Sequence, residues 1–302
     1  MSGFVRMALC SGALALAPLA LPLGSEVARA APPRVVRDVT FARVGEQRLR
    51  LDLHLPPKSR TAQGLIVWVH GGAWRRGDKG DVPMAFVDRG IATASVDFRQ
   101  STEAHFPAMI HDIKAAIRFL RARAPEYGYR TDRIAIAGSS SGAHLAALVG
   151  VTNGQGDLEG TLGSDLDRSS NVQAIVSYYG ASNLTTILAQ STPYGLSVRR
   201  PALESLLGAL PDQARELATL ASPVMHVDRS DPPLLLLHGD QDPQMPINQS
   251  HELAGAYEKF GLDVSFDVVH GAAHGDGNGE RRFFSTERVD RAVAFLRRTI
   301  GQ

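Results

Sequence analysis

The sequence predicts an α/β fold in which a mostly parallel central sheet carries helices on both faces and has a small cap insertion. Short apolar runs alternate with segments of helical periodicity along the 302 residues, which is the pattern of repeated strand–helix–strand units. Most of these runs are apolar without interruption, as expected for parallel strands buried on both faces. A content of 44% hydrophobic and 21% charged residues indicates a globular protein with a sizeable core.

The individual elements follow from periodicity. We expect strands at residues 49–55, 64–69, 91–96, 134–137, 174–178, 234–237 and 264–269. Helices are expected at residues 107–123, 141–149, 248–260 and 286–299. Pro107 suits the start of its helix, because its ring pre-sets φ and its missing N–H would have no partner there.

Residues 181–224 interrupt the alternation and contain prolines at positions 193, 201, 211 and 223. Short helices are expected there at 202–207 and 211–220. An insertion of this size between two strands predicts a small cap over the carboxyl edge of the sheet, where ligands bind in open α/β sheets. We treat this cap as part of one catalytic domain, residues 31–302.

The first thirty residues have the pattern of a secretory signal peptide. Arg6 precedes an apolar run at 7–23, and Ala28-Arg29-Ala30 forms a small-x-small site, so cleavage is expected after Ala30. A membrane anchor is the alternative, but the run is short and contains two prolines. We therefore expect a secreted or periplasmic protein that has no membrane association after cleavage.

Cleavage would change the charge and the thiol content. It would remove Arg6, Arg29 and Glu26, leaving 30 basic and 30 acidic residues, and also Cys10, the only cysteine. A neutral chain has no electrostatic signature of nucleic-acid binding. Without cysteine, neither disulfides nor thiol chemistry is expected in the mature chain.

The segment GSSSG, residues 138–142, fits the G-x-S-x-G pattern centred on Ser140. An expected strand precedes it and an expected helix follows it. A sharp strand-to-helix turn forces its central residue into a strained conformation, and only small neighbours tolerate the crowding. This context predicts that Ser140 is a catalytic nucleophile and that no linker lies here.

A serine nucleophile needs a base that is oriented by a carboxylate. Asp240 and Asp242 both follow the expected strand at 234–237, and His270 and His274 both follow the strand at 264–269. We prefer Asp242 as the acid, because it lies farther into the loop and precedes a proline that fixes the turn. We prefer His274 as the base, because His270 still belongs to the strand end.

The last requirement is an oxyanion hole, in which backbone N–H groups face the developing negative charge. The segment HGGAW, residues 70–74, follows the strand at 64–69. Gly72, Ala73 and Ser141 are the expected donors. Trp74 is assigned to substrate binding, with ordinary packing as the alternative, and His144 is expected to be a structural histidine.

Taken together, the motifs resemble those of α/β-hydrolases of the esterase/lipase type, near the hormone-sensitive-lipase group and similar to bacterial acetyl-xylan and feruloyl esterases. The resemblance extends from about Val39 to the C-terminus. It is carried by the segments HGGAWRRGDK (70–79), GSSSGAHLAALVG (138–150), LLLLHGDQDPQMPINQSHEL (234–253) and VVHGAAHG (268–275). It implies the same triad of Ser140, Asp242 and His274. This chain departs from the family in having Ser141 after the nucleophile, where alanine is usual, and Phe98, where tyrosine is common.

The expected function is that of a secreted serine carboxylic-ester hydrolase that forms an acyl-enzyme. Short-acyl or small aromatic-acid esters, of acetyl or feruloyl type and either free or linked to a polysaccharide, are the expected substrates. No cofactor and no metal are expected, although Asp276, Asn278 and Glu280 alternate as calcium ligands do. An amidase, formamidase or peptidase on the same fold is the alternative enzyme, and a catalytically silent binding protein is the alternative class.

Overall fold

The computed structural model describes residues 1, 3, 33–57, 63–276 and 282–301. The predicted signal peptide lies outside the described residues, apart from Met1 and Gly3. Asn278 and Glu280 of the polar loop also lie outside them. All helices and strands among the described residues lie within residues 31–302.

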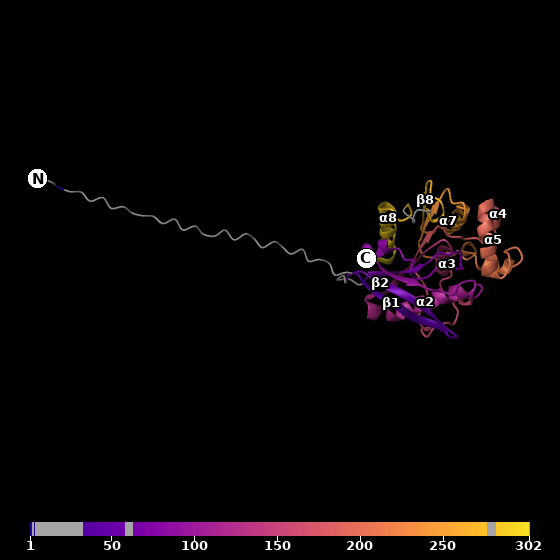
Figure 1. Cartoon of the computed structure of the whole chain (residues 1–302), viewed down its shortest axis with the longest axis horizontal. Helices are drawn as coiled ribbons and strands as arrows, with labels where there is room; N and C mark the ends of the chain where they lie inside the picture. The colour runs from indigo at the N-terminus through magenta and orange to yellow at the C-terminus, as the bar shows by residue number, and fades with distance from the viewer. Residues whose placement is uncertain (2, 4–32, 58–62, 277–281, 302) are drawn as a thin grey trace. The chain divides into compact units, whose positions relative to one another are not determined.

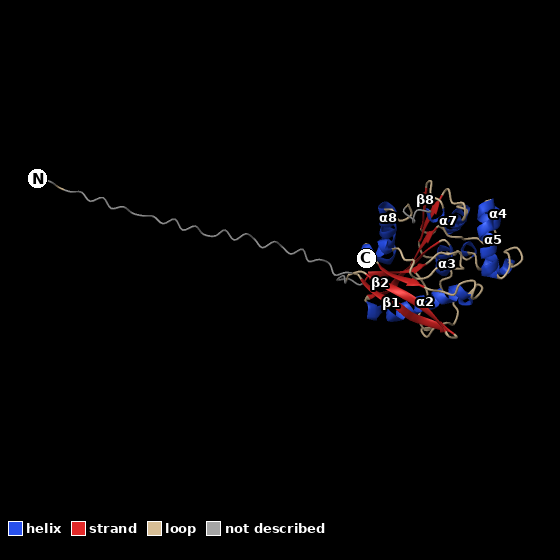
Figure 2. Cartoon of the chain, viewed as in Figure 1, coloured by secondary structure: helices blue, strands red, loops and turns tan. Residues whose placement is uncertain are grey.

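Eight strands form one sheet, in the order β1-β2-β4-β3-β5-β6-β7-β8 (Figure 2). The first two strands run antiparallel to their neighbours, and all pairs from β4·β3 to β7·β8 are parallel. The bounds are β1 Arg34–Val44, β2 Gln47–Leu55, β3 Gln63–Val69, β4 Ala92–Val96, β5 Tyr129–Ser139, β6 Ala174–Tyr178, β7 Leu234–Gly239 and β8 Val264–Val269. The predicted mostly parallel sheet is confirmed.

Helices cover both faces of the sheet (Figure 1). One face packs against α2 (Ala108–Tyr127), α3 (Ser141–Gly150) and α7 (Asn248–Phe260), and the other against α1 (Met84–Asp88) and α8 (Thr286–Leu296). Alternate residues of β3 accordingly enter different cores, with Val67 in the first and Trp68 in the second. Among the described residues, no helix is long and apolar enough to cross a membrane.

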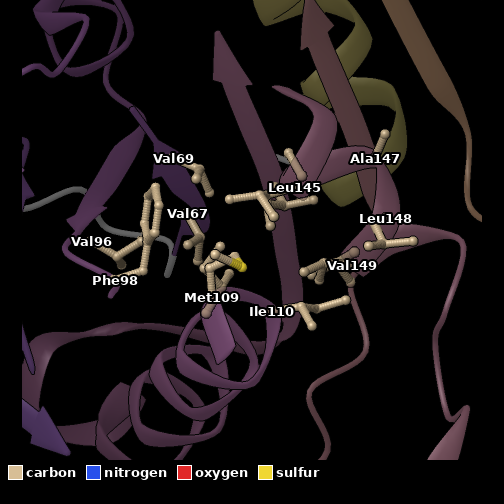
Figure 3. Close-up of a cluster of buried hydrophobic side chains, with 14 of the residues drawn as sticks. Val67, Val69, Val96, Phe98, Met109, Ile110, Leu145, Ala147, Leu148 and Val149 are labelled. Atoms are coloured by element: carbon tan, nitrogen blue, oxygen red, sulfur yellow. The ribbon is translucent and has the colours of Figure 1, made fainter. Parts of the chain in front are cut away.

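The larger core holds the serine-bearing turn in place. Leu145 and Val149 of α3 pack in it with Met109 of α2 and with Val67 and Val69 of β3 (Figure 3). All five side chains are fully buried. Because α3 starts directly after Ser140, this packing fixes the direction in which the helix leaves the turn.

The structure contains elements that the sequence does not predict, among them strand β1 and the short helices α1 and α4 (Ile187–Gln190). In the cap, helix α5 spans Pro193–Leu207, whereas the sequence predicts a helix only from residue 202. The longer helix starts earlier because the Thr192 side chain accepts a hydrogen bond from the N–H of Gly195 and Pro193 occupies the first turn.

The cap, residues 181–224, also contains α4 (Ile187–Gln190), α6 (Arg215–Leu220) and the 3₁₀ turn η2 (Pro223–Met225). Its start is tied to α7, since the N–H groups of Ser182 and Asn183 donate to the side chain of Gln249. Thr192 Oγ1 donates to the carbonyl of Pro243 at 2.9 Å. The cap is therefore attached both to a core helix and to the loop after β7.

Candidate active site

Ser140 occupies the turn between β5 and α3 with φ 53° and ψ −120°. This is a left-handed conformation that a residue with a side chain rarely adopts, and it costs about 1–3 kcal/mol. The N–H of Ser140 donates to the carbonyl of Tyr178, and its own carbonyl accepts from the N–H of His144. These two bonds anchor the turn to β6 on one side and to α3 on the other.

The glycines that flank this turn are required by space. A Cβ atom at Gly142 would lie 2.1 Å from the carbonyl oxygen of Val69 and 2.3 Å from that of His70. A Cβ atom at Gly138 would lie 2.6 Å from the backbone of Gly142. The G-x-S-x-G spacing thus reflects how closely the turn approaches the end of β3.

Ser140, His274 and Asp242 form a continuous hydrogen-bonded chain. Ser140 Oγ lies 2.8 Å from His274 Nε2, and His274 Nδ1 lies 2.7 Å from Asp242 Oδ2. A carboxylate can only accept, so Nδ1 carries the imidazole proton and Nε2 accepts from the serine hydroxyl. This is the arrangement in which a histidine can remove the serine proton.

Asp242 is held as an anion in a buried position. Burial alone would raise the pKa of this carboxyl, but hydrogen bonds from His238 and His274 lower it well below its usual range. The N–H groups of Gln244 and Met245 both donate to Oδ1 at 2.8 Å. The carboxylate is thereby oriented as well as charged.

His238, at the end of β7, was not singled out from the sequence. Its Nε2 lies 3.0 Å from the carbonyl of Met245 and 3.4 Å from Asp242 Oδ2, while Nδ1 lies 2.7 Å from Ser250 Oγ. The carbonyl contact makes Nε2 the donor, so Nδ1 accepts from the serine. His238 therefore braces the loop that carries Asp242.

The imidazole of His274 is in the neutral form that can act as a base. Burial lowers the pKa of its imidazole from 6.5, and the hydrogen bond and charge of Asp242 oppose this only in part. The ring of Tyr179 packs edge-on against the imidazole, with centroids 4.9 Å apart. At neutral pH the imidazole is thus unprotonated at Nε2, as proton abstraction requires.

The alternative acid and histidine lie elsewhere. Asp240 Oδ2 is 2.8 Å from His270 Nδ1, and Asp240 Oδ1 accepts from the N–H of Gly271. The side chain of His270 is 84% exposed. The structure thus brings together the preferred pair, Asp242 and His274, whereas Asp240 pairs with the loop after β8.

The HGGAW segment lines the same site from the end of β3. Gly72 has φ 116° and Ala73 has φ 57°, so the chain turns sharply here beside Ser140. A Cβ atom at Gly72 would lie 2.0 Å from the carbonyl oxygen of Arg76, which excludes any larger residue. Ser141 is the first residue of α3, where an N–H has no acceptor within the helix. Gly72 and Ala73 line the same cavity as Ser140, and Ser141 follows it directly at the start of α3, which is where oxyanion-hole donors are expected.

The expectation that Trp74 lines the substrate pocket is wrong in this structure. Its side chain is fully buried, and its Nε1 donates to His144 Nδ1 at 3.1 Å. His144 in turn contacts the carbonyl of Ala221 at the end of α6. Because φ of Trp74 is also positive, at 60°, the loop turns this side chain into the core and away from the cavity. His144 is structural, in line with the sequence prediction.

A cavity of about 400 Å³ opens over Ser140 and His274. Gly72 and Ala73 line one side, and Tyr179, Val198, Arg199 and Gln244 line the rest with neighbouring residues. Val198 and Arg199 come from α5, so the cap does reach the site. The sequence did not reveal Tyr179 or Arg199 as lining residues, because neither belongs to a motif that carries chemistry.

No metal-binding group is found in this part of the molecule. Among the described residues there is no cluster of three or more histidine, cysteine, aspartate or glutamate side chains that could hold an ion.

The parallel sheet and the serine turn at the end of β5 define an α/β-hydrolase. The chain belongs to the BD-FAE family, whose model matches residues 51–257. The expected resemblance to esterases of this fold is confirmed by the relatives of this chain.

Esterase LipC of Mycobacterium tuberculosis is 30% identical over 70% of this chain and 55% of its own length. The probable isoprenylcysteine alpha-carbonyl methylesterase ICMEL1 of Arabidopsis thaliana is 29% identical over 81% of this chain and 52% of its own. This chain thus spans about half the length of these curated relatives.

A solved structure matches almost end to end. A truncated form of a carbohydrate esterase from gut microbiota has a TM-score of 0.78 and 30% identity, over 91% of this chain and 99% of that one. Esterase 2 of Thermogutta terrifontis with bound propionate, at 24% identity and a TM-score of 0.66, shares the fold.

Proposed function

We propose that this protein is a secreted or periplasmic serine carboxylic-ester hydrolase with Ser140 as nucleophile, His274 as base and Asp242 as acid. The observation that carries the proposal is the 2.8 Å contact between Ser140 Oγ and His274 Nε2 at a strained turn beside a cavity. The esterase names of its relatives support the same reaction class.

The reaction follows from the proton positions. His274 Nε2 takes the hydroxyl proton while Ser140 Oγ attacks the ester carbonyl, and the N–H groups of Gly72, Ala73 and Ser141 stabilise the oxyanion. His274 then gives that proton to the leaving alcohol. Water, activated by the same imidazole, releases the acid from the acyl-enzyme. Asp242 stabilises the imidazolium throughout.

The proposed substrates are esters of short acyl chains or small aromatic acids, free or attached to a polysaccharide. The cavity volume of about 400 Å³ supports a compact substrate. The carbohydrate esterase with a similar structure supports a sugar-linked alcohol. The leader pattern ending at Ala30 supports export.

Hydrolysis of 4-nitrophenyl acetate and 4-nitrophenyl octanoate by the wild type and by Ser140→Ala tests the reaction. We expect faster cleavage of acetate, and a fall in kcat on the order of 10⁵-fold in the variant. If Ser140→Ala cleaved these esters as fast as the wild type, the serine mechanism would be rejected. Faster cleavage of 4-nitroacetanilide than of the matched acetate would favour an amidase.

Export has a separate test. Mass spectrometry of the protein recovered from outside the cytoplasm should give a chain that begins at Ala31. An intact chain in the cytoplasm would contradict the proposed location without affecting the proposed reaction.

A further inference from the structure

Arg199 is a buried cation in the wall of the catalytic cavity. It lies on α5 of the cap, its side chain is among the largest buried ones at 1% exposure, and it lines the same cavity as Ser140 and His274. Within the described part of the chain, its Nε and Nη1 atoms have no hydrogen-bond partner. A buried guanidinium normally has its donors satisfied by carboxylates or carbonyls.

Asp242, the buried carboxylate whose charge acts on Arg199, does not satisfy the donors of this side chain. Asp242 Oδ1 accepts from two backbone N–H groups, and its Oδ2 faces His274 and His238. Asp242 therefore acts on Arg199 only through its charge. Burial lowers the pKa of Arg199 to about 10, and the charge of Asp242 opposes this, so the side chain remains a cation at neutral pH.

The other charged residues that line the cavity are exposed. Arg76 and Asp81 lie on the segment after the HGGAW turn, and both side chains face solvent. Their opposite charges balance at the rim, which leaves Arg199 as the buried charge in the wall of the cavity, apart from the triad. A buried guanidinium with unsatisfied donors attracts a carboxylate, whose oxygens can accept a charge-assisted hydrogen bond from it.

We propose that Arg199 binds a carboxylate carried by the ester substrate, so that this hydrolase prefers esters with an acidic group near the scissile bond. The inference rests on the proposed function and specifies its substrate. His274 and Asp242 both feel the charge of Arg199, and His274 must protonate the leaving alcohol. The acidic group is therefore expected on the alcohol portion.

Two matched pairs of substrates test this. The first is 4-acetoxybenzoate against methyl 4-acetoxybenzoate, with the charge on the alcohol portion. The second is mono-4-nitrophenyl adipate against its methyl ester, with the charge on the acyl portion. We expect the wild type to favour the charged member of the first pair at least tenfold in kcat/KM, mainly through KM. A preference for the charged member of the second pair would instead indicate that the carboxylate bound by Arg199 belongs to the acyl portion.

Arg199→Met should abolish the preference between charged and neutral substrates, whatever its effect on the overall rate. Arg200→Met removes an exposed arginine from the next position of the same helix and should retain the wild-type ratio. Arg199→Lys, which keeps the charge without the planar fork, should retain part of it. Competition by benzoate and by benzamide in the wild type gives a readout that does not depend on the folding of any variant.

Equal kcat/KM within both pairs, or equal inhibition by benzoate and benzamide, would overturn the proposal. A second result would also overturn it, namely that Arg199→Met keeps the wild-type preference for the charged substrate and raises only the pH midpoint at which kcat/KM falls in acid. Arg199 would then act on the pKa of His274 and not on the substrate. Failure of the proposed function would give a different result, because wild type and Ser140→Ala would then cleave every ester at the same rate.

Discussion

Asp240 Oδ2 lies 2.8 Å from Nδ1 of His270, a contact that repeats, at the surface, the one between Asp242 and His274. The two pairs come from the same two loops, after β7 and after β8. They differ in burial: the side chain of His274 is 11% exposed and that of His270 84% exposed. Only the buried pair reaches the serine.

This duplication provides a matched comparison. Asp242→Asn should lower kcat by about 10⁴-fold, because an amide can hold the wrong tautomer of His274 and cannot stabilise its charge. Asp240→Asn, which changes the exposed copy of the same contact, should stay within about threefold of the wild type. Steady-state kinetics with 4-nitrophenyl acetate measures both. A large loss in Asp240→Asn with little loss in Asp242→Asn would reverse the assignment of the acid.

The pH profile should report His274. Protonation of this imidazole blocks proton abstraction, so kcat/KM for a neutral ester should fall as the pH drops through the pKa of His274. Burial holds that pKa below 6.5, and the midpoint of the acid limb should therefore lie below this value. In Asp242→Asn the midpoint of the acid limb should lie at a still lower pH, because the wild-type carboxylate raises the pKa of His274. A midpoint above 6.5 in the wild type would contradict the assignment.

Gly142→Ala should destabilise the fold as well as the site. Its Cβ atom would meet the carbonyl oxygens of Val69 and His70, which belong to the backbone and cannot yield. We expect a loss of about 3 kcal/mol or more in the free energy of unfolding. Gly255→Ala on α7 is the control, because nothing lies within 4 Å of its added Cβ. That substitution should stabilise the helix by about 0.5–1 kcal/mol. Urea denaturation compares the two, and equal stability would reject the steric explanation.

Asp231 should make stability depend on pH. Burial raises the pKa of this carboxyl from 3.8 to about 7, so the folded chain holds a proton that the unfolded chain has lost. Stability should therefore fall as the pH rises from about 4 to 7, by on the order of 3 kcal/mol. Asp231→Asn keeps an acceptor for the N–H of Asp228 and should remove that slope.

Denaturation at pH 4, 5.5 and 8 measures the effect. The advantage of Asp231→Asn over the wild type should grow with pH, whereas Asp212→Asn at an exposed position should follow the wild type throughout. A parallel pH dependence of all three proteins would exclude Asp231 as the source.

The motifs allowed the arrangement of the site to be predicted, because its parts follow strand ends that periodicity reveals. Strands β6 and β8 and helix α7 begin and end where the sequence predicts. Strand β1 was missed because its alternation is broken: its pairing with β2 shifts register twice, and Asp38 within it has φ 57°. An edge strand with bulges leaves no clear period of two.

The side-chain directions around the loops could not be predicted. Trp74 turns inward because its own φ and the acceptor on His144 decide its direction, and neither follows from the motif. Arg199 enters the cavity because α5 begins nine residues before the helix that the sequence predicts. A helix of that length in a proline-containing insertion depends on its cap at Thr192, which is a weak signal by itself.

The hydroxyl of Thr192 links the start of α5 to the carbonyl of Pro243, the residue that follows Asp242. Exchanging the cap between related enzymes is one way to alter substrate selectivity. In this chain the hydrogen bond between Thr192 and Pro243 determines which segments must be exchanged together. A chimera that replaces 181–224 alone would separate the incoming helix from its anchor and disturb the acid loop. Transplanting the insertion together with the loop after β7 keeps the donor and acceptor paired, so these two segments form one unit of exchange.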